Sequence, residues 1–158
     1  MRELKAEFYV QTTPERVLNL LKNETLALKW MKGVNKFNLM EKPSDSHWYS
    51  YIQYDIPWPL SNQDCIVKYE LLQTSSEKVF HVQMKGIPDY IPAKDGITRI
   101  DHLLGSWVIT TSSSNTCKVS YTIMSGQPPK FPRWITDPII QSNLVNTMDA
   151  FRNIAAQK

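Results

Sequence analysis

The sequence predicts an α+β fold in which an antiparallel sheet of about seven strands is capped by a long C-terminal helix. Three observations support it: short segments of alternating apolar and polar residues, helix-start signals after the first of them, and helical periodicity near the C-terminus. Turns rich in Pro, Gly, Ser or Asp separate the alternating segments. At 158 residues, the chain is expected to be a single domain, residues 1–158.

The first three elements follow from local signals. An alternation typical of a half-buried strand places apolar side chains at Leu4, Ala6, Phe8 and Val10. Pro14 and Glu15, which follow a threonine cap at Thr12 or Thr13, are typical of a helix N-terminus. A second short helix is predicted at about residues 24–32. Both small helices therefore follow the first strand directly.

Six further strands and the terminal helix complete the predicted fold. The strands are expected at about residues 34–40, 47–56, 65–72, 78–85, 97–110 and 116–125. One apolar stripe at helical spacing marks the last helix, with Ile140, Leu144, Met148, Phe151 and Ala155 in the stripe and Ile139 and Val145 beside it. This stripe must face the sheet.

Composition and charge exclude several functional classes. The 18 basic and 15 acidic residues give a net charge of +3 without any basic run, so we expect no nucleic-acid partner. No apolar run approaches the ~20 residues of a membrane span, and the N-terminus lacks the apolar core of a signal peptide. We therefore expect a cytoplasmic protein, although a leader removed earlier would leave no trace in this sequence.

The sequence offers little for catalysis or metal binding. Cys65 and Cys117 lie on different predicted strands and are expected to be buried free thiols. The three histidines show no metal-ligand spacing, so no metal or other cofactor is expected. Because no nucleophile motif is present, we predict no catalytic residue and expect a protein that is not an enzyme.

The most informative stretch, P-W-P-L-S-N-Q-D at residues 57–64, connects two apolar strands. Its prolines fix φ and remove two amide donors, which predicts a stiff, partly buried connection. The motif resembles that of START lipid-transfer domains and their bacterial relatives, within the helix-grip, Bet v 1-like (SRPBCC) superfamily. Further similar motifs follow in the family's order at residues 96–102, 105–107, 116–121 and 131–135.

The resemblance extends over about residues 4–155 and implies the helix-grip fold, with a cavity between the sheet and the C-terminal helix. Relative to the family the chain is short at its N-terminus, where an extra helix and strand are expected. The resemblance implies binding of a hydrophobic small molecule, such as a lipid, a sterol-like molecule or an acyl chain, for transfer or sensing. Periodicity alone, in contrast, favours an ordinary filled core.

Strand parity taken from the family turns one face of each strand toward the helix stripe, and Leu71 and Val119 share that face. The ligand-binding residues predicted in this way are Ser50, Ile52, Tyr54, Val67, Tyr69, Phe80, Val82, Met84, Arg99, Asp101, Leu103, Trp107, Tyr121, Ile123, Ile140, Leu144, Met148 and Phe151. Ser50 and Tyr69 occupy positions that carry an acid and an arginine in some sterol-binding relatives. At this level we therefore expect a neutral hydroxyl pair.

Three charged residues require separate treatment. Arg99 and Asp101 lie two positions apart on the predicted strand 97–110 and so share a face. If that face is inward, they are expected to pair with each other and to hold a hydroxyl, carboxylate or phosphate of the ligand. If a bulge turns them outward, they form an ion pair in water. Asp64 is expected to accept backbone hydrogen bonds at the turn that leads into Cys65.

Two other functions compete with lipid binding. One is a polyketide aromatase/cyclase-like enzyme of the same superfamily that uses Arg99, Asp101 and Tyr69. The other is a protein-interaction module, similar to a chaperone cofactor, that presents the apolar loop 86–92. We expect a monomer or a weak homodimer, because the strand at residues 4–10 can leave an open sheet edge. A transient membrane contact is also expected of a lipid carrier.

Overall fold

The computed structural model describes residues 2–40, 44–56, 60–73, 79–125 and 133–157. Along the chain these residues form β1 (Arg2–Val10), α1 (Pro14–Leu21), α2 (Glu24–Trp30), β2 (Val34–Met40), β3 (His47–Tyr54), β4 (Gln63–Gln73), β5 (Val79–Gly86), β6 (Thr98–Arg99), β7 (Leu103–Ser113), β8 (Thr116–Ser125) and α3 (Arg133–Ala155). The first two residues of the predicted helix entry at 131–135, the prolines of the 57–64 motif and the side chain of Ile139 fall outside the described part.

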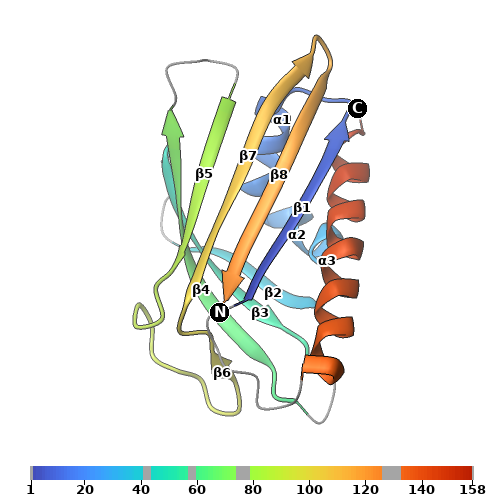
Figure 1. Cartoon of the computed structure of the whole chain (residues 1–158). Helices are drawn as coiled ribbons and strands as arrows, with labels where there is room; N and C mark the ends of the chain where they lie inside the picture. The colour runs from blue at the N-terminus through green and yellow to red at the C-terminus, as the bar shows by residue number, and fades with distance from the viewer. Residues whose placement is uncertain (1, 41–43, 57–59, 74–78, 126–132, 158) are drawn as a thin grey trace.

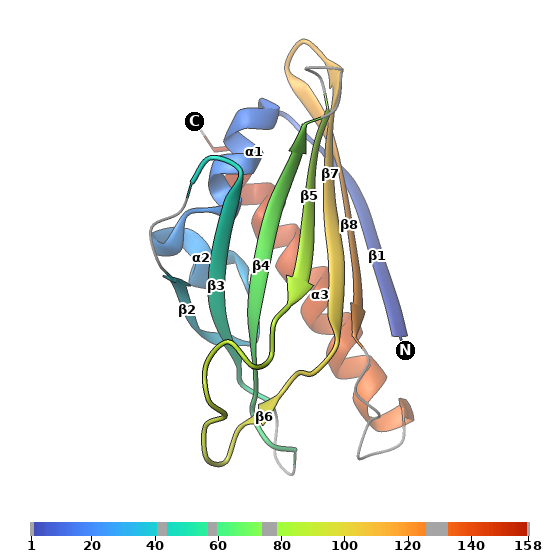
Figure 2. The same cartoon turned by 90° about the vertical axis from the view of Figure 1, so that its left-hand side faces the viewer.

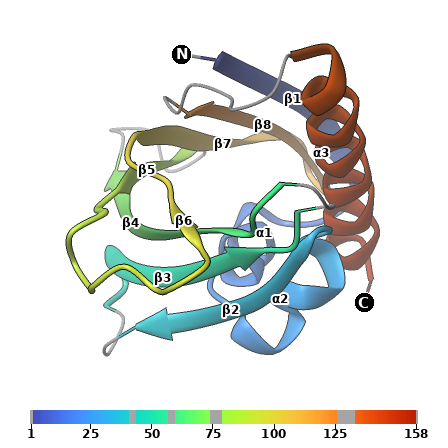
Figure 3. The same ribbon diagram turned by 90° about the horizontal axis from the view of Figure 1, so that it is seen from below.

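Seven strands form one curved antiparallel sheet, in the order β1-β8-β7-β5-β4-β3-β2, and the two-residue strand β6 adds a parallel pairing to β4. Viewed from below, the sheet curls around an interior and α3 stands between its two edges, next to β1 and α2 (Figures 1 and 3). This architecture confirms the predicted fold class. The predicted strand 97–110 is wrong, because residues 100–102 leave the sheet between β6 and β7.

The small helices begin where the sequence predicts. The Thr13 side chain accepts a hydrogen bond from the backbone N–H of Arg16 (3.3 Å), and Pro14 opens α1. Asn23 caps α2 in the same way, accepting from the N–H of Leu26 (3.0 Å). The turn into β2 needs a left-handed backbone at Gly33 (φ +79°), which glycine adopts without steric penalty.

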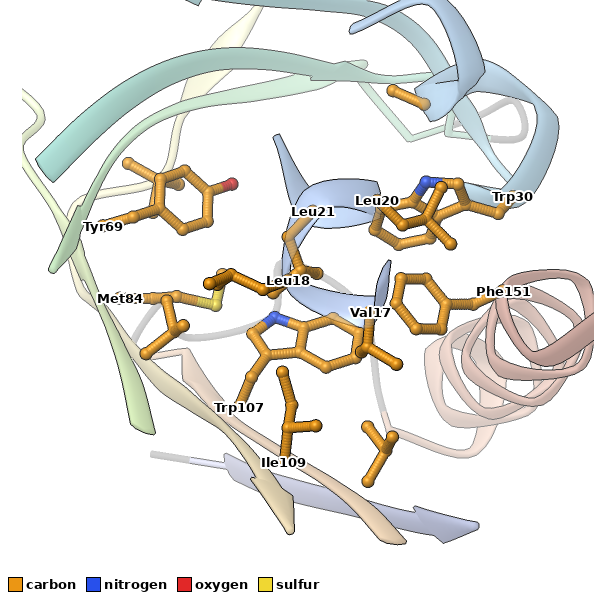
Figure 4. Packing of buried hydrophobic residues seen from close by; sticks show 14 of the residues in the cluster. Val17, Leu18, Leu20, Leu21, Trp30, Tyr69, Met84, Trp107, Ile109 and Phe151 are labelled. Atoms are coloured by element: carbon orange, nitrogen blue, oxygen red, sulfur yellow. The ribbon is translucent and has the colours of Figure 1, made fainter. Parts of the chain in front are cut away.

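One end of the interior, next to α1, is closely packed. Phe151 of α3 is fully buried and lies edge-on to Trp30 of α2, with ring centroids 4.8 Å apart. It also contacts Trp107 of β7 at 5.0 Å, and Val17 of α1 packs beside these rings (Figure 4). Ile109, from β7, is likewise fully buried. This end of the sheet therefore has the filled core that periodicity alone predicts.

The edge strand β1 is only partly covered. It pairs with β8 on one side, and α3 lies along it on the other. Near the end of β1, the Arg152 Nε donates a hydrogen bond to the carbonyl oxygen of Tyr9 (2.8 Å). Among the described residues, none of the helices has the length and apolarity that a membrane span requires.

Candidate ligand-binding site

The concave face of the sheet carries the predicted sheet residues on β3, β4, β5, β7 and β8. Strand registers place Ile52 opposite Cys65, Tyr69 opposite Met84, and Trp107 opposite both Val82 and Tyr121. The residues that share this face are Ser50, Ile52, Tyr54, Val67, Tyr69, Phe80, Val82, Met84, Leu103, Trp107, Tyr121 and Ile123. The predicted parity is confirmed for these positions, and their ligand role stays a prediction.

From the opposite side, α3 supplies three of its four predicted residues to the packed interior. Met148 and Phe151 are buried in the hydrophobic cluster, and Leu144 packs against it while remaining partly exposed. Ile140 is partly buried. The sheet and the helix therefore bring the predicted set together, except for Ile140, Arg99 and Asp101.

A group of neutral polar side chains lies on the concave face. The Ser50 hydroxyl donates to Tyr69 Oη (2.9 Å), which confirms the predicted neutral hydroxyl pair. Cys65, opposite Ile52, and Tyr54, two positions further along β3, share this face. Burial raises the pKa of Tyr54, Tyr69 and Tyr121 above that of a free phenol and raises the pKa of Cys65 to about 12. All four groups are therefore neutral at physiological pH.

Solvent reaches this face at the end away from α1. Tyr54, Tyr121 and Ile123 are partly exposed although they point to the inside of the curved sheet. Val119, two positions before Tyr121 on β8 and opposite the buried Ile109, has no exposed area. A side chain on the inside can be exposed only to solvent that enters the interior of the curved sheet. The space next to the tyrosines is therefore where a ligand could replace water.

A hollow of about 230 Å³ lies between β1 and α3. Its apolar lining comes from Ala6 and Phe8 of β1 and from Leu144 and Met148 of α3, and charged residues such as Arg152 border it. Ligand pockets usually measure ~300–1,000 Å³. This hollow alone is too small for a whole lipid, and it adjoins the concave face along the sheet edge.

Sequence reasoning left out several residues of the concave face, and Cys65 and Gly105 are two of them. Cys65 lies two positions before Val67 on β4, so the same parity extended by one step would have identified it. Gly105 lies opposite Ile123, and a Cβ placed there would come within 2.8 Å of the Thr122 carbonyl oxygen. The glycine of the predicted G-S-W motif therefore allows β7 and β8 to pack closely beside the tyrosines.

Arg99 lies on the other side of the sheet. Its Nε is 2.6 Å from Asp64 Oδ1 and its Nη2 is 3.1 Å from Oδ2, a bidentate pair that is almost fully buried. The Tyr51 hydroxyl donates to the same carboxylate (2.8 Å). The predicted pair between Arg99 and Asp101 is wrong, since Asp101 is exposed. Strand parity failed because the chain leaves the sheet between these two residues.

The Asp64–Arg99 pair also fixes the loop that precedes β6. The Arg99 guanidinium donates to three carbonyl oxygens of that loop, those of Pro88 and Ile91 (both 2.8 Å) and of Pro92 (3.2 Å). Figure 2 shows this loop and β6 at the end of the sheet where β4 begins. Asp64 is structural, as predicted, but in the described part of the chain its carboxylate is held by side chains rather than by the predicted backbone donors.

The same contacts predict an acid-sensitive contribution to stability. Burial by itself would raise the pKa of Asp64, but hydrogen bonds from Arg99 and Tyr51 outweigh it and hold that pKa below its usual value. The ionised carboxylate therefore stabilises the fold above the pKa of the unfolded state, about 4, and this stabilisation is lost as the pH falls through the folded pKa.

We expect urea unfolding at pH 7 and pH 3 to show a larger loss of stability for the parent protein than for Asp64→Asn, because the amide does not titrate. Asp101→Asn is the matched control and should follow the parent protein, since Asp101 is exposed. An equal pH dependence of the parent and Asp64→Asn would contradict the assignment.

No protein-family model matches the chain. Among curated proteins, it is similar to an uncharacterised protein of Pseudomonas aeruginosa, with 23% identity over 130 residues that cover 82% of this chain. The match spans 63% of the length of that protein. At this level of identity, the sequence comparison alone assigns no activity.

Solved structures give a clearer result for the fold. A fragment of a STAR-related lipid transfer protein from Xanthomonas axonopodis has a TM-score of 0.87 and 24% identity, over 99% of this chain and 87% of that one. Human StAR-related lipid transfer protein 5 has a TM-score of 0.77 and 14% identity (98% and 74%). The Zhui aromatase/cyclase from Streptomyces sp. R1128 has a TM-score of 0.66 and 13% identity (98% and 93%). The chain has the START fold, which aromatase/cyclase proteins share.

Proposed function

We propose that the chain binds one hydrophobic molecule, a lipid, between the concave face of the sheet and α3. The observation that carries this proposal is the partial exposure of Tyr54, Tyr121 and Ile123 on an otherwise apolar inner face. A ligand there would gain ~0.8 kcal/mol for each methylene removed from water, and the neutral hydroxyls would orient its polar end. The lipid-transfer proteins among the similar structures support the same function.

Native mass spectrometry of the purified protein, followed by organic extraction, tests this function. We expect an adduct whose mass matches a lipid recovered in the extract, and we expect that adduct to disappear after delipidation and to return when lipid is added. A protein that carries no adduct and takes up no added lipid would contradict the proposal.

The enzyme alternative lacks the charged residues that it was expected to use. Arg99 is engaged with Asp64 and the loop before β6, and Asp101 is exposed. Of the predicted catalytic set only Tyr69 lies on the concave face. In the described residues, the two charged members of the predicted catalytic set are therefore not assembled with Tyr69 on the concave face.

The loop 86–92 and the sheet edge at β1 are the two features that concern possible protein partners. Arg99 ties this loop to the sheet, and Tyr90 stacks on Tyr49 of β3 with ring centroids 5.4 Å apart, so the loop covers the outer face of the sheet. This arrangement favours a structural role over an interaction module. We further propose that the protein is a monomer that self-associates weakly through β1. We also propose that it contacts a membrane transiently during lipid exchange.

A further inference from the structure

The concave face carries several uncharged polar groups, among them three phenols and one thiol. Tyr54, Tyr69, Tyr121 and Cys65 share the strand parity of this face, so all four side chains point toward the interior. They come from three different strands, β3, β4 and β8, which the curvature of the sheet brings together. In Figure 4 the Tyr69 hydroxyl points into the interior that Trp107 and Met84 also face.

Two of these groups have an O–H donor that no acceptor in the described residues uses. Tyr69 Oη accepts from Ser50, which leaves its own O–H without an acceptor in the described residues. Within the same part of the chain, the Tyr121 hydroxyl has no hydrogen-bond partner, and this residue is partly exposed to the interior. Unused donors in an apolar surrounding favour a ligand that brings an acceptor oxygen.

Within the described residues, the strands place no charged side chain on this face, and the Lys22 ammonium, which lies over the Trp48 ring, already donates to the Asp45 carbonyl oxygen. Every residue that the registers place on it is uncharged, where the side chain is described. Arg2 shares this parity, but it is four residues before Ala6, which lies opposite Tyr121, so it is ~14 Å away along the strand. The nearby Asp64–Arg99 pair lies on the other face, and its two opposite charges neutralise each other.

We propose that the site selects ligands whose polar end is an uncharged acceptor, a ketone, an ester or an alcohol, and that it excludes carboxylates and phosphates. Burying an anion without a paired cation is strongly unfavourable, whereas a carbonyl or hydroxyl oxygen can accept from Tyr69 or from Tyr121 while its chain lies on the apolar face. The inference rests on the proposed function and adds the chemical class of the ligand.

The test compares three molecules of matched chain length: methyl dodecanoate, dodecanoate at pH 8 and dodecane, each displacing the fluorophore N-phenyl-1-naphthylamine. We expect the ester to bind at least tenfold more tightly than the carboxylate. We also expect Tyr69→Phe and Tyr121→Phe each to weaken ester binding about threefold to tenfold and to leave dodecane binding unchanged, as the loss of one hydrogen bond implies. Tyr49→Phe, on the outer face, is the matched control.

The outcomes separate this inference from the proposed function. If dodecanoate binds as tightly as the ester, or if both phenylalanine variants keep full ester affinity, the class assignment is overturned and lipid binding stands. If neither the fluorophore nor any of the three molecules binds, the proposed function fails and the class assignment with it. The ratio of ester to carboxylate affinity in the unmodified protein decides the question even where a variant does not fold.

Discussion

Replacing Asp64 with alanine is expected to destabilise the protein by about 3–5 kcal/mol, the usual effect of removing one partner of a buried ion pair. Asp64 is fully buried, and its loss leaves the Arg99 guanidinium without its bidentate partner. The Tyr51 hydroxyl loses its acceptor in the same step. Urea unfolding at pH 7, with the free energy extrapolated to water, measures the effect.

Two further variants make this prediction sharper. Asp101→Ala removes an exposed carboxylate close to Arg99 in the sequence and should change stability by no more than about 0.5 kcal/mol. The double variant Asp64→Leu with Arg99→Met removes both charges and should recover part of the loss, because no buried charge then stays unpaired. The recovery should be incomplete, since three loop carbonyls lose the Arg99 donor. A loss below about 1 kcal/mol for Asp64→Ala would show that the pair does not hold the loop.

Local signals in the sequence were sufficient to predict the fold class. Alternation, with the parity of each strand taken from the family resemblance, places Ile52, Tyr69 and Trp107 on one face, and the pairing registers preserve this face from strand to strand. The hydroxyl pair of Ser50 and Tyr69 followed from parity together with the family resemblance. Within continuous strands, these arguments therefore predict which face an individual side chain occupies.

The parity arguments failed where the strand was not continuous. Arg99 belongs to a two-residue strand, and the chain leaves the sheet before Leu103, so parity counted back from β7 does not apply to it. Its partner Asp64 is 35 residues away in the sequence, on the start of β4. No periodic pattern links two such residues. Their pairing depends on how the loop before β6 folds back, which only the three-dimensional structure shows.

Leu144→Trp is expected to have the largest effect on ligand binding. This substitution should abolish binding with little loss of stability. Leu144 faces the sheet from α3 and is only partly buried, next to the hollow of about 230 Å³ between α3 and β1. An indole at this position can enter that space and the adjoining interior without displacing packed atoms. Displacement of N-phenyl-1-naphthylamine and thermal melting, measured on the same samples, follow the two effects separately.

Met148, one turn further along the helix, gives the contrasting result. It is buried in the hydrophobic cluster, so Met148→Trp should overpack that cluster and lower stability by ~1–3 kcal/mol. Asn146→Trp adds the same indole on an exposed position of α3 and should change neither binding nor stability. If Leu144→Trp is as destabilising as Met148→Trp, the interior beside Leu144 is solid and the proposed lipid site cannot lie there. If Leu144→Trp folds stably and still binds the fluorophore as the parent protein does, the ligand lies elsewhere, because an indole at this position fills the space between α3 and the sheet.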